Sequence, residues 1–346
     1  MVWNLTIFWA NLIQPQIFFY LKTKHMNSDW FGKLHRRWYK VSYFAKHAHL
    51  GFLPHSLIAQ SLEDVIREYH RQPENIQRNI DKRVSYYNQL EEVQTISGHL
   101  GIVGAFPKTK PSSYFYDLAD LLRYFPAHTP FAYEFGDVTH IPSQATLVKS
   151  RPIMGNNQNS IILKLDSVRH FYTLPDRLNF QDKKPLLVWR GAAHQANRQT
   201  FLEKFHSNPL CDAKCIHKKS INKPYHGDFM SIQNQLKYRY ILSLEGNDVA
   251  TNLKWIMASQ SLAVTPSLKY ETWLMEGLLQ PDVHFVHIED DFSNLEEKLS
   301  FYQKNPKAAC KIISNANQWM SQFFDKKQEL ITAVLVLKKY FENTQI

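Results

Sequence analysis

The first half of the chain has the spacing of amphipathic helices. Between 56 and 71, six apolar residues recur at intervals that place them on one face of a helix. Pro73 ends this pattern, and a second helix is expected from about 74 to 93. The stretch 98–106, with glycines three residues apart, predicts a strand or turn, and 115–125 predicts another helix.

From residue 131 the pattern changes to short apolar runs separated by helix-like stretches. Most runs are bounded by turn residues, as expected for strands buried in a sheet. Alternating strands and helices indicate strand–helix–strand units around parallel sheets, and therefore an α/β fold. Residues 295–342 are expected to be mainly helical. The six runs are 145–148, 160–165, 185–189, 238–244, 261–265 and 283–288.

A length of 346 residues favours two domains. A polar segment with flanking prolines, 175–185, is the expected boundary between them. The predicted divisions are a basic aromatic segment at 1–50, an N-terminal domain at 51–178, a C-terminal domain at 183–320 and a closing helix at 321–346.

The first 50 residues raise the question of a membrane. Residues 1–21 carry no charge, but five Asn, Gln and Pro residues make a spanning helix borderline. They lack the features of a secretory signal, and Met26 is an alternative start. Residues 22–49 combine seven Lys and Arg with one acid and with interleaved aromatics. Such a segment can bind an anionic membrane surface. Alternatively, its cations form a basic face in contact with water, and its aromatic residues pack onto the core.

Composition narrows the class of protein. Hydrophobic residues make up 44% and charged residues 21%, which is typical of a folded globular protein. The net charge of +10 favours anionic partners: nucleic acid, anionic lipid, phosphorylated glycan or a nucleotide. Three cysteines, Cys211, Cys215 and Cys310, indicate a reducing compartment and argue against a disulfide framework or a zinc site.

Two strand–loop–helix units carry cations where phosphate binds in α/β proteins. In the first, the strand 185–189 leads through Arg190 and Gly191 to a helix near 196–205 that contains Arg198. Ligands bind at the carboxyl ends of parallel strands, and a helix N-terminus there offers free N–H groups to phosphate. The alternative is a structural turn in which one Arg caps or pairs.

The second unit follows the strand 238–244, and Lys254 lies in an early turn of its helix. Two such units in one domain suit a nucleotide diphosphate, and Glu245 is a candidate acceptor for ribose hydroxyls. The alternative is a loop in which Asp248 or Thr251 caps the helix. The loop itself consists of Glu245, Gly246, Asn247 and Asp248.

A third segment, 131–153, offers a general base. Asp137 follows Gly136 at the end of a strand-like run, and a carboxylate there can take a proton from a substrate. The alternative is an Asp that caps a turn. No D-x-D sequence occurs, so Arg, Lys and helix dipoles rather than a divalent metal are expected to hold a nucleotide sugar. Further candidates for acceptor or phosphate contacts are His140, Lys149, Arg151 and Arg169.

Taken together, several of these segments resemble glycosyltransferase family 90. The resemblance runs from about 80 to 340. The carrying segments are 188–198 (VWRGAAHQANR), 237–255 (KYRYILSLEGNDVATNLKW), 259–264 and 281–299, and the segments 83–90, 135–142, 148–153 and 169–171 are similar to the bacterial branch.

The resemblance implies a GT-B fold, in which two Rossmann-like domains face a cleft and the second holds the donor. It implies inversion without a metal, with Asp137 as catalytic base and Arg198 as a donor contact. Lys254 stands where animal members carry Arg, which keeps the charge but loses the bidentate fork. The family's donor loop matches Gly246, Asn247, Asp248, Val249, Ala250, Thr251 and Asn252.

The predicted function is transfer of a hexose or pentose from a UDP-sugar to a lipopolysaccharide, lipooligosaccharide or other surface glycan. The UDP-sugar is a co-substrate, and no cofactor or metal is expected. The expected location is cytoplasmic and peripheral at the inner membrane, with an anionic lipid surface and no nucleic acid as partner. The alternative is a non-catalytic basic module for anionic glycan or nucleic acid, which leaves Asp137 and both phosphate-ready loops without a purpose.

Overall fold

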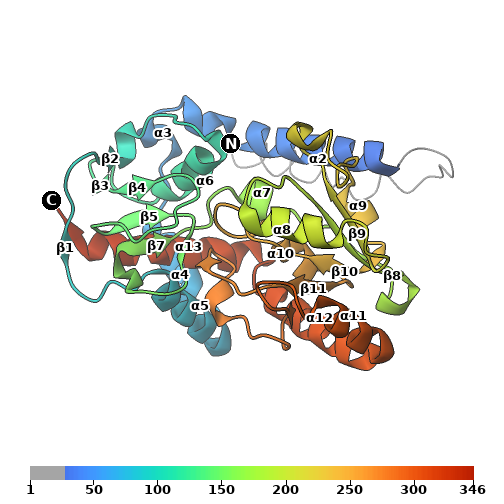
Figure 1. The fold of residues 1–346 in the computed structure, drawn as a ribbon. Helices are drawn as coiled ribbons and strands as arrows, with labels where there is room; N and C mark the ends of the chain where they lie inside the picture. Colours follow the sequence, from blue (N-terminus) through green and yellow to red (C-terminus); the bar gives the residue numbers. More distant parts are fainter. Residues whose placement is uncertain (1–27) are drawn as a thin grey trace.

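The computed structural model of the protein describes residues 28–346 and contains two larger parallel sheets (Figure 1). The first has the strand order β4-β5-β7, with strands Tyr133–Glu134, Thr146–Val148 and Ser160–Ile162. The second has the order β13-β11-β10-β8-β9. In chain order its strands are β8 (Lys184–Gly191), β9 (Cys211–Cys215), β10 (Tyr238–Leu242), β11 (Leu262–Thr265) and β13 (Val286–His287). The predicted α/β fold with parallel sheets is confirmed.

Three two-stranded sheets join segments that are distant in the sequence. The antiparallel pair of β6 and β12 connects the region of the first sheet to the loop after β11. The pairs are β1 (Gln94–Thr95) with β14 (Thr344–Gln345), β2 (Gly101–Ile102) with β3 (Pro130–Phe131), and β6 (Arg151–Pro152) with β12 (Tyr270–Glu271).

The central strands of the second sheet are buried on both faces, as expected for strands with mainly apolar runs such as 186–189 and 262–264. All four residues of β11 are buried, and side chains along β8 alternate between two hydrophobic clusters. Leu187 belongs to one cluster and Val188 to the other, since successive side chains of a strand point to opposite faces.

The strand order of the second sheet creates a switch point. From β8 the chain crosses to β9 on one side and then returns to β10 on the other side of β8. The loops that leave the carboxyl ends of β8 and β10 are therefore neighbours, and such a crevice is where α/β sheets bind ligands.

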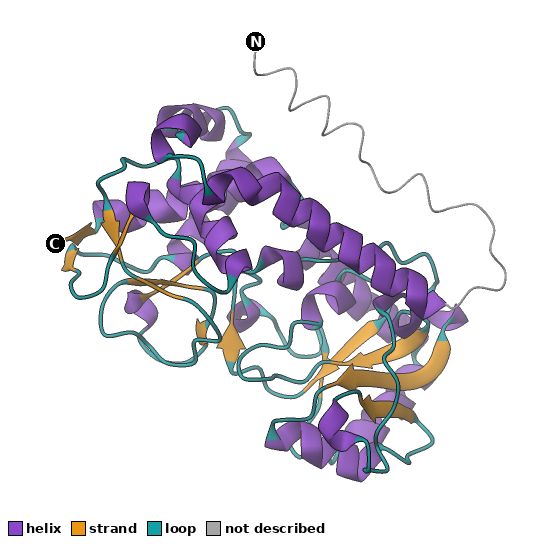
Figure 2. Ribbon diagram, turned by 90° about the horizontal axis from the view of Figure 1, so that it is seen from above, coloured by secondary structure: helices purple, strands orange, loops and turns teal. Residues whose placement is uncertain are grey.

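Helices cover the sheets (Figure 1, Figure 2), and the C-terminal helix α13 (Lys326–Glu342) returns to the first one. It packs on α5 (Glu74–Tyr87), and Tyr340 near its end accepts a hydrogen bond from the N–H of Ala132 at 2.9 Å. The predicted helical C-terminus is confirmed. The other helices are α2 (Ser28–His47), α3 (His55–Ile58), α4 (Leu62–His70), α6 (Ser112–Leu122), α7 (Ser167–His170), α8 (Ala196–Phe205), α9 (Ile232–Gln235), α10 (Leu253–Met257), α11 (Leu295–Lys304) and α12 (Pro306–Ser321).

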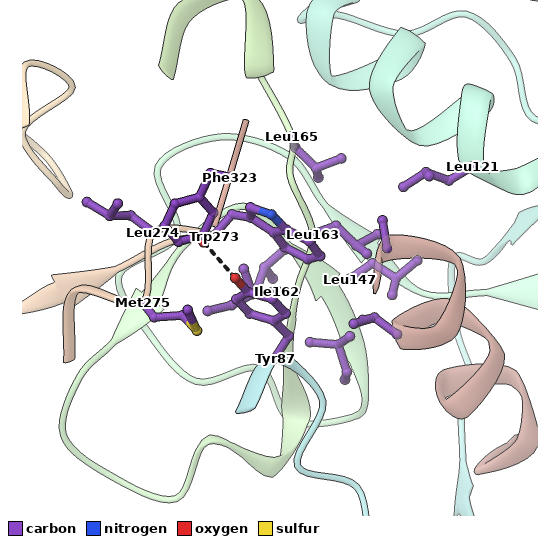
Figure 3. Packing of buried hydrophobic residues seen from close by; sticks show 14 of the residues in the cluster. Tyr87, Leu121, Leu147, Ile162, Leu163, Leu165, Trp273, Leu274, Met275 and Phe323 are labelled. Atoms are coloured by element: carbon purple, nitrogen blue, oxygen red, sulfur yellow. Dashed lines mark hydrogen bonds between the residues drawn. The ribbon is translucent and has the colours of Figure 1, made fainter. Parts of the chain in front are cut away.

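One hydrophobic cluster extends from the first sheet to α13 and to the loop after β12 (Figure 3). At its centre Tyr87 stacks on Trp273 with 3.9 Å between ring centroids, and its hydroxyl donates to the Trp273 carbonyl at 2.7 Å. Leu147 and Ile162 of the first sheet belong to the same cluster. The two sheets are thus fixed to each other by shared packing.

Helix α2 packs along α6, α7 and α9. Tyr43 donates to Asp117 Oδ1 at 2.6 Å, and Asp29 Oδ1 accepts from the N–H of Ser231 at 2.7 Å. The opposite face exposes Trp30 (52%) and Trp38 (63%), so the helix has both a packed and an open aromatic face.

Within residues 28–346, no helix combines the length and apolar character that crossing a membrane requires. The predicted borderline span at 1–21 and the alternative start at Met26 lie outside the described residues.

Some predicted boundaries differ from the structure. The single helix predicted at 56–71 is interrupted, because Ser61 Oγ accepts from the N–H of Asp64 and starts α4 anew. The helix predicted at 74–93 ends at Tyr87. The stretch 98–106 forms the short strand β2 and a 3-10 turn.

Candidate active site

Asp137 lies shortly after β4 and contacts the loop that follows β10 in the second sheet. The preceding Gly136 has a φ of 120°, a conformation that favours glycine. Asp137 Oδ1 accepts from Lys149 Nζ at 2.6 Å, and Oδ2 accepts from Asn247 Nδ2 at 3.1 Å. Burial raises the pKa of Asp137, but these two donors together outweigh burial and hold it below its ordinary value. The result is an ionised carboxylate with 26% of its side chain exposed.

Lys149 connects Asp137 to the loop that follows β10. Its ammonium lies 2.6 Å from Asp137 Oδ1 and 2.6 Å from Asp248 Oδ2, with 1% of the side chain exposed. Burial lowers the pKa of Lys149, but Asp248, Tyr114 and Asp137 raise it to a net value above the ordinary one. One buried cation therefore holds carboxylates from both sheet regions.

The loop after β10 is fixed by its amide side chains. Asn247, besides donating to Asp137, accepts from Gln195 Nε2 at 2.8 Å. Asn252 accepts from Ser243 Oγ at 3.1 Å and so ties the end of the loop to its start. The buried loop residues are Asp248, Val249 and Ala250.

Arg198 joins this loop to the one after β8. Its guanidinium donates to the carbonyls of Glu245 (3.1 Å), Ala192 (3.0 Å) and Leu244 (2.8 Å). A Cβ on Gly246 would lie 3.1 Å from Arg198 Nη2, so glycine allows this close approach. Arg198, Gly246 and the adjoining Asn247 thus bring the predicted donor contacts next to Asp137.

Arg190 and Gly191 end strand β8. Arg190 Nη2 lies 2.5 Å from Asp212 Oδ1, and Nη1 donates to the Asp212 carbonyl at 2.6 Å. A Cβ on Gly191 would lie 2.7 Å from the Trp189 ring, which excludes a larger side chain without rearrangement. Arg190 therefore forms an ion pair, as in the alternative prediction of a structural turn. It also borders a cavity.

That cavity, the arginine pocket, measures about 190 Å³. Arg169 Nη2 donates to Thr251 Oγ1 at 3.3 Å beside it. Burial, and next the charge of Arg169, lower the pKa of Arg198, and Arg169 also contributes to the low pKa of Asp137. Arg169 thus lies beside the end of the loop that follows β10. The wall of the pocket combines polar and apolar side chains: Arg36, Arg169, Arg190, Gln235, Thr251 and Asn252 with Tyr172, Ile216, Phe229, Met230, Ile232 and Trp255.

Glu245 directly precedes Gly246 and does not line the arginine pocket. Its Oε1 accepts from the N–H groups of Lys269 (3.0 Å) and Tyr270 (3.1 Å). Burial raises its pKa to about 7. It borders a second cavity of about 60 Å³, together with Asn197 and Asp290.

Three predicted residues have their ion-pair partners outside the 246–252 loop. Lys254 is fully buried and its Nζ lies 2.8 Å from Glu276 Oε1, while Arg151 is fully buried with its Nε 2.7 Å from Glu271 Oε1. Each of these two cations is enclosed with its own carboxylate, and the prediction that Lys254 and Arg151 contact donor or acceptor stays a prediction. His140 is exposed and lies 3.2 Å from Glu134.

Sequence reasoning also missed some features of the site. Asp248 pairs with Lys149, and no side chain caps α10, so neither Asp248 nor Thr251 has the alternative capping role. Arg36 was not singled out, since no local signal indicates which cation of α2 turns inward. In the part of the chain that the structure describes, no group of three or more His, Cys, Asp and Glu side chains is arranged to hold a metal ion.

Comparison with known proteins gives the family of the chain and one similar enzyme. Residues 165–343 match the family described as Glycosyl transferase family 90. The chain is also 56% identical over 309 residues to the O-glucosyltransferase LpsA of Dichelobacter nodosus, covering 89% of this chain and 97% of that protein. The second match includes a region before residue 165, where Asp137 and Lys149 lie. The chain therefore belongs to glycosyltransferase family 90, and it is a glycosyltransferase.

Proposed function

We propose that the protein is an inverting transferase that moves glucose from a UDP-sugar to a hydroxyl group. The name of its relative, an O-glucosyltransferase, supports glucose and an oxygen acceptor. The observation that carries the proposal is the contact of Asp137 with Asn247, in the same loop where Gly246 adjoins Arg198. An ionised base and the loop that Arg198 holds thereby meet at one site.

In the proposed reaction, Asp137 takes the proton from the acceptor hydroxyl as its oxygen attacks the anomeric carbon. The bond from that carbon to the diphosphate oxygen breaks on the opposite face, and the electron pair leaves with UDP. Arg198 and the 246–252 loop stabilise the negative charge on the departing diphosphate. Arg190 and Arg169 contribute positive charge beside the loop, and the mechanism requires no metal.

We further propose the GT-B arrangement, with domains at 51–178 and 183–320 facing a cleft. Two separate parallel sheets support it, and so does the switch point between β8 and β10. The helix α13, which leaves the second region and packs on α5, is consistent with a segment that closes the structure.

We propose that the acceptor is a lipopolysaccharide, lipooligosaccharide or other surface glycan, met at the cytoplasmic face of the inner membrane. The outward face of α2 supports this, because exposed Trp30, Trp38 and Val41 lie among Lys33 and Lys40. Indole rings and cations together suit an anionic lipid surface. Trp38→Ser should reduce co-sedimentation with anionic liposomes, whereas Phe301→Ser, at a 50% exposed aromatic residue on α11, should not.

Asp137→Asn is the test of the proposed chemistry. Removing the base should lower kcat by about 10²–10⁴ and leave the calorimetric affinity for UDP nearly unchanged. Full turnover by this variant would reject Asp137 as the base. Salt-sensitive oligonucleotide binding, without any thermal shift by UDP, would instead favour the non-catalytic binding module.

A further inference from the structure

A cavity larger than the arginine pocket lies between α8 and the loop after β9. Its volume is about 390 Å³, within the roughly 300–1,000 Å³ of sites for small ligands. Among its described lining residues, only Ala193 and Cys215 lack a hydroxyl, amide, imidazole or charged group. We call this cavity the histidine pocket, and the side chains used in the argument are His194, Glu203, His217, Lys219, Lys223 and Tyr225.

The segment that ends β9 separates the histidine pocket from the donor site. Ile216 lines the arginine pocket, whereas its neighbours Cys215 and His217 line the histidine pocket. Successive side chains of an extended segment point in opposite directions, so the two cavities lie on opposite sides of it. The described residues of this wall include none of the cations that the proposed reaction uses and no residue of the 246–252 loop.

The loop after β9 forms a fixed wall of the histidine pocket. His217 Nδ1 accepts from the N–H of Lys219 at 3.2 Å, and Ser220 Oγ donates to the His217 carbonyl at 2.7 Å. The loop then returns to its start, because the N–H of Cys215 donates to the Tyr225 carbonyl at 2.8 Å. Since Nδ1 accepts, the proton of the neutral His217 ring lies on Nε2, which can donate to a ligand.

The opposite wall comes from α8 and the loop before it. Gln199 Nε2 donates to the Ala193 carbonyl at 3.1 Å and so holds this loop on the helix. The His194 ring meets the His217 ring edge to face, with 4.3 Å between centroids. Contacts within the chain thus define both walls, and the pocket is preformed, as small-molecule sites usually are.

The polar groups of the pocket suit a sugar. Each sugar hydroxyl can both donate and accept, so a site for it needs groups of both kinds. Glu203 accepts, Lys219 and Lys223 donate, and none of the three forms an ion pair within residues 28–346. The ring of Tyr225 adds an apolar surface, which complements the C–H groups of a sugar ring.

Two hydrogen bonds connect the wall of the pocket to the proposed base. Gln195 directly follows His194, and its Nε2 donates to Asn247 Oδ1 at 2.8 Å. Asn247 Nδ2 in turn donates to Asp137 Oδ2 at 3.1 Å. A glycan with one hydroxyl at Asp137 can therefore extend past Gln195 into the histidine pocket.

We propose that the histidine pocket binds a sugar residue of the acceptor glycan other than the one that receives glucose, and that Glu203 accepts a hydrogen bond from one of its hydroxyls. This inference rests on the proposed function. It identifies the acceptor as an oligosaccharide, because binding of the remote sugar adds to the stabilisation of the transition state.

The test compares Glu203→Ala with Glu297→Ala, which removes the same charge from an exposed side chain of α11. Deacylated lipooligosaccharide from a strain that lacks this enzyme is the acceptor, so membrane binding plays no part. Loss of one hydrogen bond to a charged group should lower the acceptor kcat/KM about 10-fold in Glu203→Ala. The calorimetric affinity for UDP and the melting temperature should stay at their wild-type values, and Glu297→Ala should keep the wild-type kcat/KM.

Glu203→Trp fills the pocket and tests it without turnover. Saturation-transfer NMR with UDP present should detect the deacylated oligosaccharide on the wild type, and this signal should diminish in Glu203→Trp. Equal acceptor kcat/KM in the two alanine variants, an undiminished NMR signal, or a change confined to UDP affinity would overturn the inference while the proposed function stands. No glucose transfer by the wild type, with the NMR difference intact, would reject the proposed function and not the sugar site.

Discussion

Replacing Lys149 by Met separates the base from the cation that holds it. In the wild type, the Lys149 ammonium lies 2.6 Å from carboxylate oxygens of both Asp137 and Asp248. Methionine fills a similar volume but carries no charge, so two carboxylates remain next to each other without their common partner. The change therefore acts on stability and on catalysis by different routes.

The stability effect follows from burial. Removing one partner of a buried ion pair costs about 3–5 kcal/mol, and we expect about 3 kcal/mol here. The lower end applies because Asp137 keeps 26% of its side chain in solvent, whereas Asp248 keeps only 3%. Lys149→Met/Asp248→Asn should recover part of the loss, since it removes the more deeply buried charge.

The catalytic effect has a defined sign. In the wild type the pKa of Asp137 is held below its ordinary value. Its ionisation therefore contributes stability that is fully present above the ordinary pKa, and this stability is lost as the pH falls from there through the lowered pKa. Without Lys149, burial acts with less opposition and raises the pKa of Asp137. The acid limb of the kcat/KM profile should therefore move to higher pH.

The assay is glucose transfer across a pH series, with the folded fraction measured at each pH by circular dichroism. Lys149→Arg is the control, because it keeps the charge and should keep the acid limb close to that of the wild type. An acid limb in Lys149→Met that coincides with the wild-type limb would refute the claim that Lys149 keeps Asp137 ionised.

Three other substitutions test the remaining contacts. Arg198→Ala should weaken UDP binding about 10-fold by calorimetry. Arg198→Lys should not restore the affinity, because one ammonium cannot replace three contacts with carbonyl groups. Wild-type affinity for UDP in either variant would contradict the role of Arg198. Lys254→Met leaves the buried Glu276 carboxylate without its ion-pair partner. The free energy of unfolding in urea should fall by about 3 kcal/mol, with near wild-type turnover per folded molecule. A large loss of turnover would indicate that Lys254 contacts the donor. UDP-glucose affinity should fall as the pH drops through about 7, unless Glu245 is replaced by Gln, and parallel curves for both proteins would exclude Glu245.

The strands and the loop positions could be predicted because their signals are local. The apolar run at 185–189 and the helix at 196–205 correspond to β8 and α8 (Lys184–Gly191 and Ala196–Phe205). The break in the predicted helix 56–71 also had a local signal, since Ser61 with Asp64 three residues later is a capping pattern. Boundaries of this kind follow from side chains within one turn.

The roles of the cations could not be predicted in the same way. Lys149, Arg151 and Lys254 all follow strand or loop signals, and the sequence does not distinguish a cation in a cleft from one in the interior. Their partners Asp248, Glu271 and Glu276 are brought to them by tertiary packing. Burial of a charge depends on such distant carboxylates, and no pattern near the cation reports them.

A crystal structure of the protein with UDP would test the central claim most directly. The account predicts the diphosphate against residues 246–252, within hydrogen-bond distance of Arg198 or the loop N–H groups, with Asp137 facing the terminal phosphate across the space for a sugar. UDP bound elsewhere, or bound with Asp137 turned away from its phosphates, would contradict it.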